Sequence, residues 1–411
     1  MALLAAGCGG GEDVSKARVR FVNASTYSAL TLKVGDDTPA SSVAYGADTG
    51  YQNVEPGSRT ADVSSPGSAT ILSSASVSLS KDRDYTLLAY GKAGALAQVL
   101  LDDEIGTPSS GKALVRVINA AADAGSVDVY LTGASEALGS ATALQSGAVY
   151  GTMNGFVTIN SGDWRLRVTA AGSKTDVRLD VANLNFDSES VRTLVITPSR
   201  GGVLVNALVV RQGGGLDNAA NTQARVRVVA GAGGSQPVVA SVGGTALLAG
   251  DTAPARTAYT TLAAGTVAVA ASAGSSTAAL TSATLQGGGD YTLLVWGASG
   301  SAQAAMLEDD NSRPSDSARA RMRLVNGVAG ASGTLSLKVE FLVTVSGVAA
   351  GTASSYADLA AASTPQLDVS AAGSSSTLCS VANKDVSANG VYTLFALGDA
   401  TATSCVLSTD R

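Results

Sequence analysis

Four copies of one sequence unit make up nearly all of the chain, and this repetition constrains the fold more than any other feature. Each copy opens with a phrase in which arginine alternates with apolar residues, such as Ala-Arg-Val-Arg-Phe-Val-Asn at residues 17–23. The phrase begins at Ala17, Ala113, Ala224 and Ala320, so successive copies lie 96, 111 and 96 residues apart. Units of this length can each bury a core of their own.

Two further markers follow the opening phrase in the same order in every copy. A phrase built on Tyr-Thr-Leu lies at residues 84–88, 290–294 and 391–395, and the second copy has Val-Arg-Thr-Leu-Val at 191–195. A tyrosine lies near the middle of each copy, at Tyr45, Tyr150, Tyr259 and Tyr356. Three markers repeated four times in one order indicate four domains that share an ancestor.

Short segments within each copy alternate apolar with polar residues, for example residues 30–34, 127–131 and 164–168. A period of two is typical of strands with one buried and one solvated face, and Gly-rich and Pro-Gly turns separate these segments. We therefore predict an all-β protein of four tandem, separately folded Ig-like antiparallel β-sandwich domains. The predicted bounds are 1–16 for an N-terminal tether and 17–111, 112–222, 223–317 and 318–411 for the domains.

The composition excludes several classes of function. Lys plus Arg number 27 and Asp plus Glu 33, for a net charge of −6, and such an acidic chain lacks the cationic surface that binds nucleic acid. Histidine is absent, which excludes Ser-His-Asp and Cys-His catalysis and His-ligated metals. The uncharged stretch 257–289 is rich in Ala, Gly, Ser and Thr, so we expect strands and turns there rather than a membrane-spanning helix.

The N-terminal sequence resembles the end of a bacterial lipoprotein signal peptide. An apolar run at residues 3–7 ends in small residues before Cys8, and a Gly-rich polar tether follows. The resemblance implies that Cys8 is lipidated and anchors the exported chain to a membrane. Gly9 stands where Asp would favour retention in an inner membrane. We therefore predict a protein that is lipid-anchored in the cell envelope, in the bacterial outer membrane or periplasm.

The other two cysteines, Cys379 and Cys405, both lie in the last copy. In an exported protein they are expected to oxidise to a disulfide, which would stabilise the fold by about 3 kcal/mol. Two free buried thiols are the alternative. Neither arrangement supplies a base that would activate a thiolate for catalysis.

The repeat also resembles a known bacterial family, the domain of unknown function 4397. The resemblance is carried by the opening phrase, the central and closing phrases and the acidic ending of copy 1, at residues 17–23, 43–46, 50–51, 84–87 and 101–103. It implies tandem β-sandwich domains on exported, often lipid-anchored envelope proteins, and it implies no established activity. Copies 2 and 4 depart from the pattern in the Tyr-Thr phrase or the acidic ending.

Three recurring features are candidates for a function. The acidic phrases at 102–104 and 308–311 lie at junctions between copies, where clustered carboxylates either bind calcium or, as we favour, form a solvated linker. The four tyrosines are predicted to pack against neighbouring strands rather than to line a ligand surface. Arginine pairs such as Arg18/Arg20 and Arg225/Arg227 are expected on one solvated sheet face in surface salt bridges, and a strip that binds carboxylates or sugars is the alternative.

These observations favour a non-catalytic envelope lipoprotein that serves as a binding, adhesion or scaffolding array, because linked modules multiply weak contacts. We predict no catalytic residue, no metal site and no cofactor. The expected partners are the membrane, through a lipid on Cys8, and an envelope polymer, glycan or protein. A passive spacer or stalk and an enzyme that uses a carboxylate pair are the alternatives.

Overall fold

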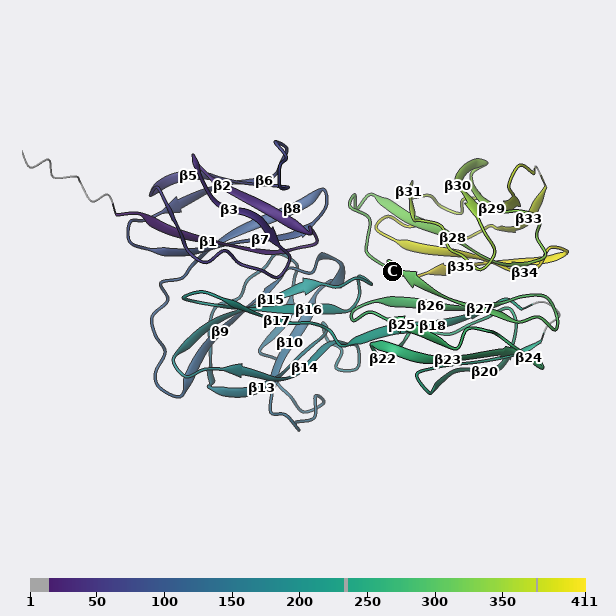
Figure 1. The fold of residues 1–411 in the computed structure, drawn as a ribbon, viewed down its shortest axis with the longest axis horizontal. Coiled ribbons are helices and arrows are strands. Elements are labelled where there is room, and N and C mark those ends of the chain that lie inside the picture. Colours follow the sequence, from purple (N-terminus) through teal and green to yellow (C-terminus); the bar gives the residue numbers. More distant parts are fainter. Residues whose placement is uncertain (1–14, 233–235, 375) are drawn as a thin grey trace, which may run out of the picture.

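The computed structural model describes residues 15–232, 236–374 and 376–411 (Figure 1). Within these residues the secondary structure is 35 strands and one short 3-10 helix, η1 (Ala122–Ala124). The strands form eight sheets, which confirms the all-β prediction. The described part of the chain contains no helix that is both long and apolar enough to cross a membrane. Cys8 lies outside the described residues.

The eight sheets pair as four two-sheet units, which we number in chain order. Unit 1 has sheets β4-β1-β7-β8 and β3-β2-β5-β6, and unit 2 has sheets β12-β9-β15-β16-β17 and β11-β10-β13-β14. The strands of unit 1 are β1 (Ala17–Ser25), β2 (Ala29–Val34), β3 (Asp37–Ala44), β4 (Gln52–Val54), β5 (Gly57–Ser64), β6 (Ile71–Leu79), β7 (Asp84–Lys92) and β8 (Ala95–Asp102). Those of unit 2 are β9 (Lys112–Asn119), β10 (Val127–Thr132), β11 (Gln145–Ala148), β12 (Val157–Asn160), β13 (Gly162–Ala170), β14 (Val177–Phe186), β15 (Ser190–Pro198), β16 (Val205–Arg211) and β17 (Leu216–Ala219).

Units 3 and 4 repeat the same plan. Unit 3 has sheets β21-β18-β26-β27, with β22 also on β18, and β20-β19-β23-β24, with β25 also on β23, and unit 4 has sheets β31-β28-β34-β35 and β30-β29-β32-β33. The strands of unit 3 are β18 (Gln223–Ala230), β19 (Pro237–Val242), β20 (Thr245–Thr252), β21 (Ala255–Arg256), β22 (Thr260–Ala263), β23 (Gly265–Ala273), β24 (Ser276–Thr277), β25 (Ser282–Leu285), β26 (Asp290–Trp296) and β27 (Gln303–Asp309). Those of unit 4 are β28 (Arg319–Ala329), β29 (Leu335–Val339), β30 (Leu342–Val348), β31 (Ala357–Ala360), β32 (Leu367–Ala371), β33 (Thr377–Val381), β34 (Val391–Asp399) and β35 (Ala402–Thr409).

One strand pair at the centre of each unit is parallel, which corrects the prediction of wholly antiparallel sheets. The opening phrase pairs in parallel with the Tyr-Thr phrase, as β1 with β7, β9 with β15, β18 with β26 and β28 with β34. Parallel neighbours need a long crossover, and in unit 1 the strands of the second sheet lie between β1 and β7 in the sequence. The parallel register sets the arginines of the first phrase directly beside the threonine of the second.

Each unit has its own apolar core between its two sheets, but the units also share buried clusters in pairs. Val22 and Leu88 of unit 1 pack with Ile118 and Val195 of unit 2. The corresponding cluster of units 3 and 4 comprises Val229, Leu294, Trp296, Val325, Phe395 and Leu397. The expectation of a solvated sheet face was therefore wrong, because the neighbouring unit covers that face.

The two pairs lie side by side in a two-by-two arrangement, with unit 1 beside unit 2 and unit 4 beside unit 3 (Figure 1). Gly231 lets the backbones of units 3 and 4 approach closely, since a Cβ at this position would lie 2.7 Å from a methyl carbon of Leu397. Its carbonyl accepts a hydrogen bond from the backbone N–H of Gly398 at 3.0 Å. Between the pairs, the Arg313 N–H donates to Asp123 of unit 2 at 2.9 Å.

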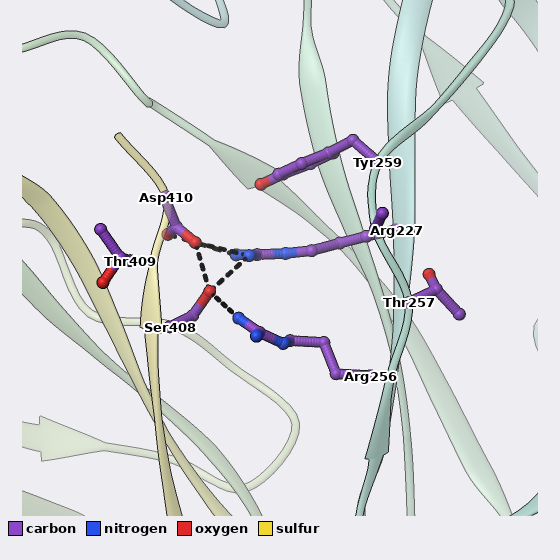
Figure 2. A pocket seen from close by; sticks show the side chains of 8 residues that line it. Arg227, Arg256, Thr257, Tyr259, Ser408, Thr409 and Asp410 are labelled. Carbon is purple, nitrogen blue, oxygen red and sulfur yellow. Dashed lines mark hydrogen bonds and ion pairs between the residues drawn. The ribbon is translucent and has the colours of Figure 1, made fainter.

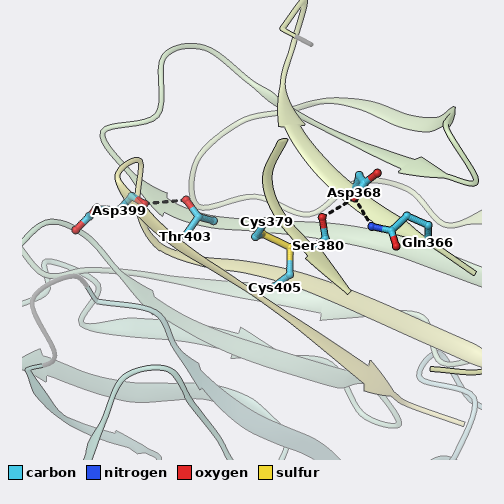
Figure 3. The surroundings of a disulfide bond; sticks show 7 residues. All are labelled: Gln366, Asp368, Cys379, Ser380, Asp399, Thr403 and Cys405. Atoms are coloured by element: carbon cyan, nitrogen blue, oxygen red, sulfur yellow. Dashed lines mark hydrogen bonds between the residues drawn. A yellow bond between two sulfur atoms is a disulfide. The ribbon is translucent and has the colours of Figure 1, made fainter. Parts of the chain in front are cut away.

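Cys379 on β33 and Cys405 on β35 form a disulfide, with 5.5 Å between their Cα atoms (Figure 3). These two strands are the edges of the two sheets of unit 4, so the bond ties the sheets together along one side. The equivalent edges of unit 1, β6 and β8, carry no cysteine.

Replacement of both Cys379 and Cys405 by serine is expected to lower the free energy of unfolding of unit 4 by about 3 kcal/mol, because the unfolded chain regains the entropy that the closed loop removes. Differential scanning calorimetry of the oxidised chain and the double variant measures the loss. Unit 1, which has no cysteine, is the internal control. Reduction of the unmodified chain should reproduce the shift, and melting that is insensitive to reduction would contradict the prediction.

Candidate functional site at the junction of units 3 and 4

One buried arginine recurs in the opening phrase of every unit. Its Nε–H donates to the threonine of the Tyr-Thr phrase, in the pairs Arg20–Thr86 at 2.6 Å, Arg116–Thr193 at 2.9 Å, Arg227–Thr292 at 2.9 Å and Arg323–Thr393 at 3.1 Å. We expected these arginines in surface salt bridges, and this was wrong. Between 0 and 8 % of each of the four residues is exposed, because the neighbouring unit covers their sheet face. Of the preceding arginines, Arg18 is exposed and forms an ion pair with Asp84, as expected. Arg225 is instead largely buried and pairs with the buried Asp290.

An aromatic ring packs on each buried guanidinium. The distances from guanidinium carbon to ring centroid are 5.2 Å for Arg20–Tyr51, 4.5 Å for Arg116–Phe156, 4.7 Å for Arg227–Tyr259 and 4.9 Å for Arg323–Tyr356. These cation–π contacts add attraction that is strongest where water is excluded.

The repeated aromatic position therefore differs from the tyrosine marker that the sequence suggested. Tyr45 and Tyr150 lie six residues before the equivalent rings of their units. Both still contact neighbouring strands, as we predicted. The Tyr45 hydroxyl lies 2.8 Å from the Thr197 hydroxyl of unit 2, and Tyr150 packs edge-on against Tyr90 of unit 1 at 5.8 Å between centroids.

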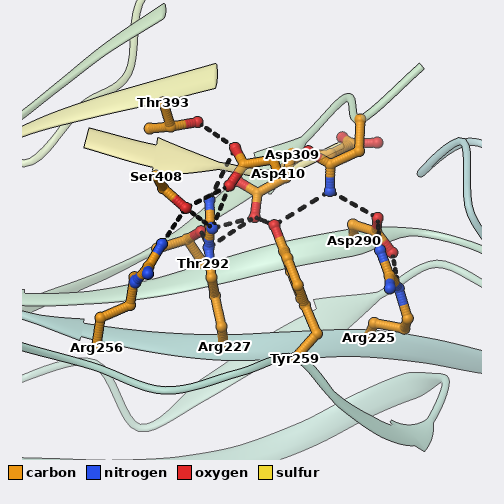
Figure 4. A network of polar contacts seen from close by, with 12 residues as sticks. Arg225, Arg227, Arg256, Tyr259, Asp290, Thr292, Asp309, Thr393, Ser408 and Asp410 are labelled. Carbon is orange, nitrogen blue, oxygen red and sulfur yellow. Dashed lines mark hydrogen bonds and ion pairs between the residues drawn. The ribbon is translucent and has the colours of Figure 1, made fainter. Parts of the chain in front are cut away.

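Units 3 and 4 exchange their charges across the junction (Figure 4). Arg227 of unit 3 donates through Nη1 to Oδ1 of Asp410 in unit 4 at 2.5 Å, and Arg323 of unit 4 donates through Nη2 to Asp309 of unit 3. Neither aspartate side chain is exposed to solvent. Each unit thus supplies the counter-ion of the other, and a buried charge of this kind is tolerated only when it is paired.

The hydroxyl groups complete this network. Thr292 and Tyr259 both donate to Oδ2 of Asp309 at 2.6 Å, and Thr393 donates to Oδ2 of Asp410 at 2.6 Å. Burial tends to raise the pKa of Asp309, but the guanidinium groups of Arg323 and Arg227 outweigh it and hold that pKa below its ordinary value. Burial likewise opposes the charge of Arg227, yet Asp410 and Asp309 raise its pKa above the ordinary value. Asp309 and Arg227 are therefore ionised throughout the physiological range.

A hollow of about 320 Å³ opens beside this network (Figure 2). Residues of both units line it, namely Arg227, Arg256, Thr257, Ala258, Tyr259, Ser408, Thr409 and Asp410. Arg256 is exposed and donates to the Ser408 hydroxyl. The Ser408 hydroxyl also accepts from Arg227 at 3.1 Å and donates to Asp410 at 2.7 Å. The hollow presents guanidinium and hydroxyl donors, which suit a ligand that carries carboxylate or hydroxyl groups.

Units 1 and 2 do not repeat this exchange among the described residues, because Arg20 forms its ion pairs with Asp48 and Asp103 of its own unit. Asp103 accepts from Thr86 at 2.5 Å and from Tyr51 at 2.7 Å, and Arg20 donates to the Arg211 carbonyl of unit 2 at 2.5 Å. The residue of unit 2 that corresponds to Asp103 is Gln212, and both residues donate their N–H to the first residue of the Tyr-Thr phrase. Burial accordingly lowers the pKa of Arg116, and the charge of Asp103 compensates only in part.

The acidic phrases thus supply buried counter-ions rather than a solvated linker. Asp103 and Asp309 are buried members of the network, while Asp102 forms an exposed ion pair with Arg83. Among the residues that the structure describes, no group of three or more acidic or cysteine side chains is arranged to hold a metal ion. The alternation of arginine in the opening phrase was the available signal for this site. The ring and aspartate positions were harder to recognise as repeated, because unit 2 has Phe156 and Gln212 there.

Tyr259 and Tyr356 provide a matched pair of hydroxyl deletions. The Tyr259 hydroxyl donates to Asp309 and accepts from Asn311 at 3.1 Å, whereas the buried Tyr356 hydroxyl has no hydrogen-bond partner among the described residues. Tyr259→Phe should therefore lower the free energy of unfolding by about 1–3 kcal/mol, and Tyr356→Phe should leave it unchanged or raise it. Urea denaturation measures both, and equal losses would contradict the assigned hydrogen bonds.

The junction should also lose stability in acid. Because the pKa of folded Asp309 lies below that of the unfolded chain, its ionisation contributes stability that is complete above about pH 4 and disappears as the pH falls through the folded pKa. Asp309→Asn should cost about 3 kcal/mol at pH 7, and the difference from the unmodified chain should shrink towards pH 2. The exposed Asp36 is the control, and Asp36→Asn should change little at either pH. A difference that does not depend on pH would refute the ionised state of Asp309.

Comparison with known proteins supports the family suggested by the repeat. The family model described as "Domain of unknown function (DUF4397)" matches residues 17–130 and 224–338. No curated protein matches the chain. Twelve chains of solved structures match, among them "The Bacillus anthracis TIE protein" at 7 % identity, with 68 % of this chain and 50 % of that chain covered and a TM-score of 0.15. Our chain thus spans about half of that structure, and a TM-score so low carries no argument. The two family matches together cover more than half of the sequence, and the chain belongs to the DUF4397 family.

Proposed function

We propose that the chain is a non-catalytic scaffold or binding array of the bacterial cell envelope, built from four Ig-like sandwiches and anchored through a lipid on Cys8. The observation that carries the proposal is the place of the repeated chemistry. The arginine, threonine and aromatic side chains that recur in every unit lie in the joints between units. A ligand-binding array would instead repeat its chemistry on exposed surfaces, so the scaffold role is favoured.

The state of the buried carboxylates supports a non-catalytic role. Asp309 and Asp410 come from different units and both approach Arg227, and Asp309 also pairs with Arg323. A carboxylate pair that hydrolyses glycosides needs one carboxylic acid with a raised pKa to protonate the leaving group. The pKa of Asp309 is lowered instead, and an aspartate that remains ionised does not donate a proton. This argues against Asp309 as the general acid of such a pair.

A binding role remains the second candidate because of the hollow at the junction. Arg256 is exposed there and contacts the Ser408 hydroxyl, so its guanidinium is accessible to a carboxylate or a sugar hydroxyl. Acidic envelope glycans have this chemistry. Within the described residues Arg256 has this environment at the junction of units 3 and 4, so the scaffold would then hold a ligand there.

Small-angle X-ray scattering of residues 17–411 tests the scaffold. The shared apolar clusters and the exchanged charges predict one compact shape that fits the two-by-two arrangement at both low and high salt. Scattering that requires an ensemble of extended, independently moving units would reject the proposal.

Two further measurements test the lipid anchor and the binding role. Fatty-acid labelling of the full chain should depend on Cys8 and disappear in Cys8→Ser, and retention on an acidic-glycan panel that is lost in Arg256→Ala would select the binding role.

A further inference from the structure

The hairpin of β29 and β30 in unit 4 ends in an exposed apolar tip. Phe341, Leu342 and Val343 are 75, 74 and 60 % exposed, more than any other large apolar side chain in the described residues. Contiguous exposed apolar residues on a soluble surface mark an interaction site.

The backbone of this turn adopts a conformation that glycine would accept more readily. Glu340 and Phe341 have φ angles of 48° and 69°, in the left-handed region that is unfavourable for residues with a Cβ. The equivalent turns of units 1 and 3 use Gly35 and the pair Gly243-Gly244. Unit 4 therefore keeps an aromatic residue at the tip despite backbone strain, which is typical of functional positions.

The strand that follows the tip is an unprotected sheet edge. β30 pairs only with β29, and its sequence, Leu-Val-Thr-Val-Ser-Gly-Val, has no charge and no proline. The strands at the equivalent edges have features that disfavour pairing with another strand. β3 carries Asp37 and Pro39, β20 carries Asp251, and β11 has only four residues. A free edge without charge, proline or short length can pair with another strand.

A hollow of about 350 Å³ runs along β30 and is lined by residues 344–348 and 352–357, which carry no charged side chain. Gly347 lies within it, and a Cβ at this position would meet nothing within 4 Å. There is open space over Gly347 that a side chain from another strand can occupy.

We propose that β30 is a self-association site, at which the β30 edges of two copies of this chain pair antiparallel. The register that centres on Thr344 places Leu342 opposite Ser346 and Phe341 opposite Gly347. The aromatic ring of each copy then covers the glycine of the other and enters its hollow. One surface on both copies makes both contacts, as two-fold symmetry requires, and the absence of charge on β30 means that the two edges do not repel each other.

The inference builds on the proposed scaffold, because chains held in one membrane plane meet at a high effective concentration and a short edge contact then suffices. The scaffold does not depend on it in return. A compact, monomeric chain in solution would leave the scaffold intact and reject the self-association.

Sedimentation velocity of the full chain carrying Cys8→Ser, over a range of concentrations, is the test. The chain with an unmodified β30 should show a monomer–dimer equilibrium. Val343→Lys places a like charge on both edges and should weaken the dimer by about tenfold or more. Val239→Lys is the matched control, because Val239 is 49 % exposed on β19, which has strands on both sides, and it should leave the dimer unchanged.

A second variant separates loss of the site from loss of the fold. The double substitution Glu340→Asn, Phe341→Gly places Asn-Gly in this turn, a pair that adopts positive φ angles readily. Thermal stability should therefore be kept or raised while the dimer is lost. In a Thr344→Cys chain, the central register should give a disulfide between copies. A chain that stays monomeric at every concentration, or a dimer that Val343→Lys does not weaken, would overturn the proposal. So would a monomer whose tip instead drives binding to phosphatidylglycerol vesicles.

Discussion

The fold of this protein depends on the burial of arginine between packed sheets. A guanidinium group removed from water is tolerated only when its donors are paired and its charge is balanced. In each unit the parallel strand pair supplies the first partner, a threonine at the same register position. At the junction of units 3 and 4 the charge is balanced by an aspartate from the neighbouring unit. The position of one unit relative to the next is therefore fixed by the requirement to satisfy these groups.

The two joints differ in how completely this requirement is met. Units 3 and 4 exchange two arginine–aspartate pairs, whereas unit 2 has Gln212 at the corresponding position and leaves Arg116 with the threonine and an aromatic ring. The same plan thus tolerates the loss of one carboxylate where the shared apolar cluster is larger, as it is between units 1 and 2. Apolar burial and charge exchange contribute in different proportions to the two joints.

Much of the fold could be predicted from the sequence, because repetition and period-two alternation are local properties of the chain. The all-β class agrees with the structure, and the DUF4397 family agrees with the match of the family model. The joints could not be predicted in the same way. Alternation shows that Arg20 and Phe21 face opposite sides of a sheet, but it does not show what covers the side that carries the arginine. The parallel pairing also depends on contacts between distant segments, and the Tyr51 position was hidden because unit 2 has Phe156 there.

The parallel pair at the centre of each unit has a consequence for how the chain becomes folded. Arg20 meets Thr86 across 66 residues, and the equivalent separations in the other units are 77, 65 and 70. The first strand of a unit therefore finds its central neighbour only after most of that unit has been synthesised, and such non-local pairing is slow. During synthesis the chain emerges N-terminus first, so each opening strand waits unpaired until its partner has been made. This delay makes the order of emergence the order of assembly.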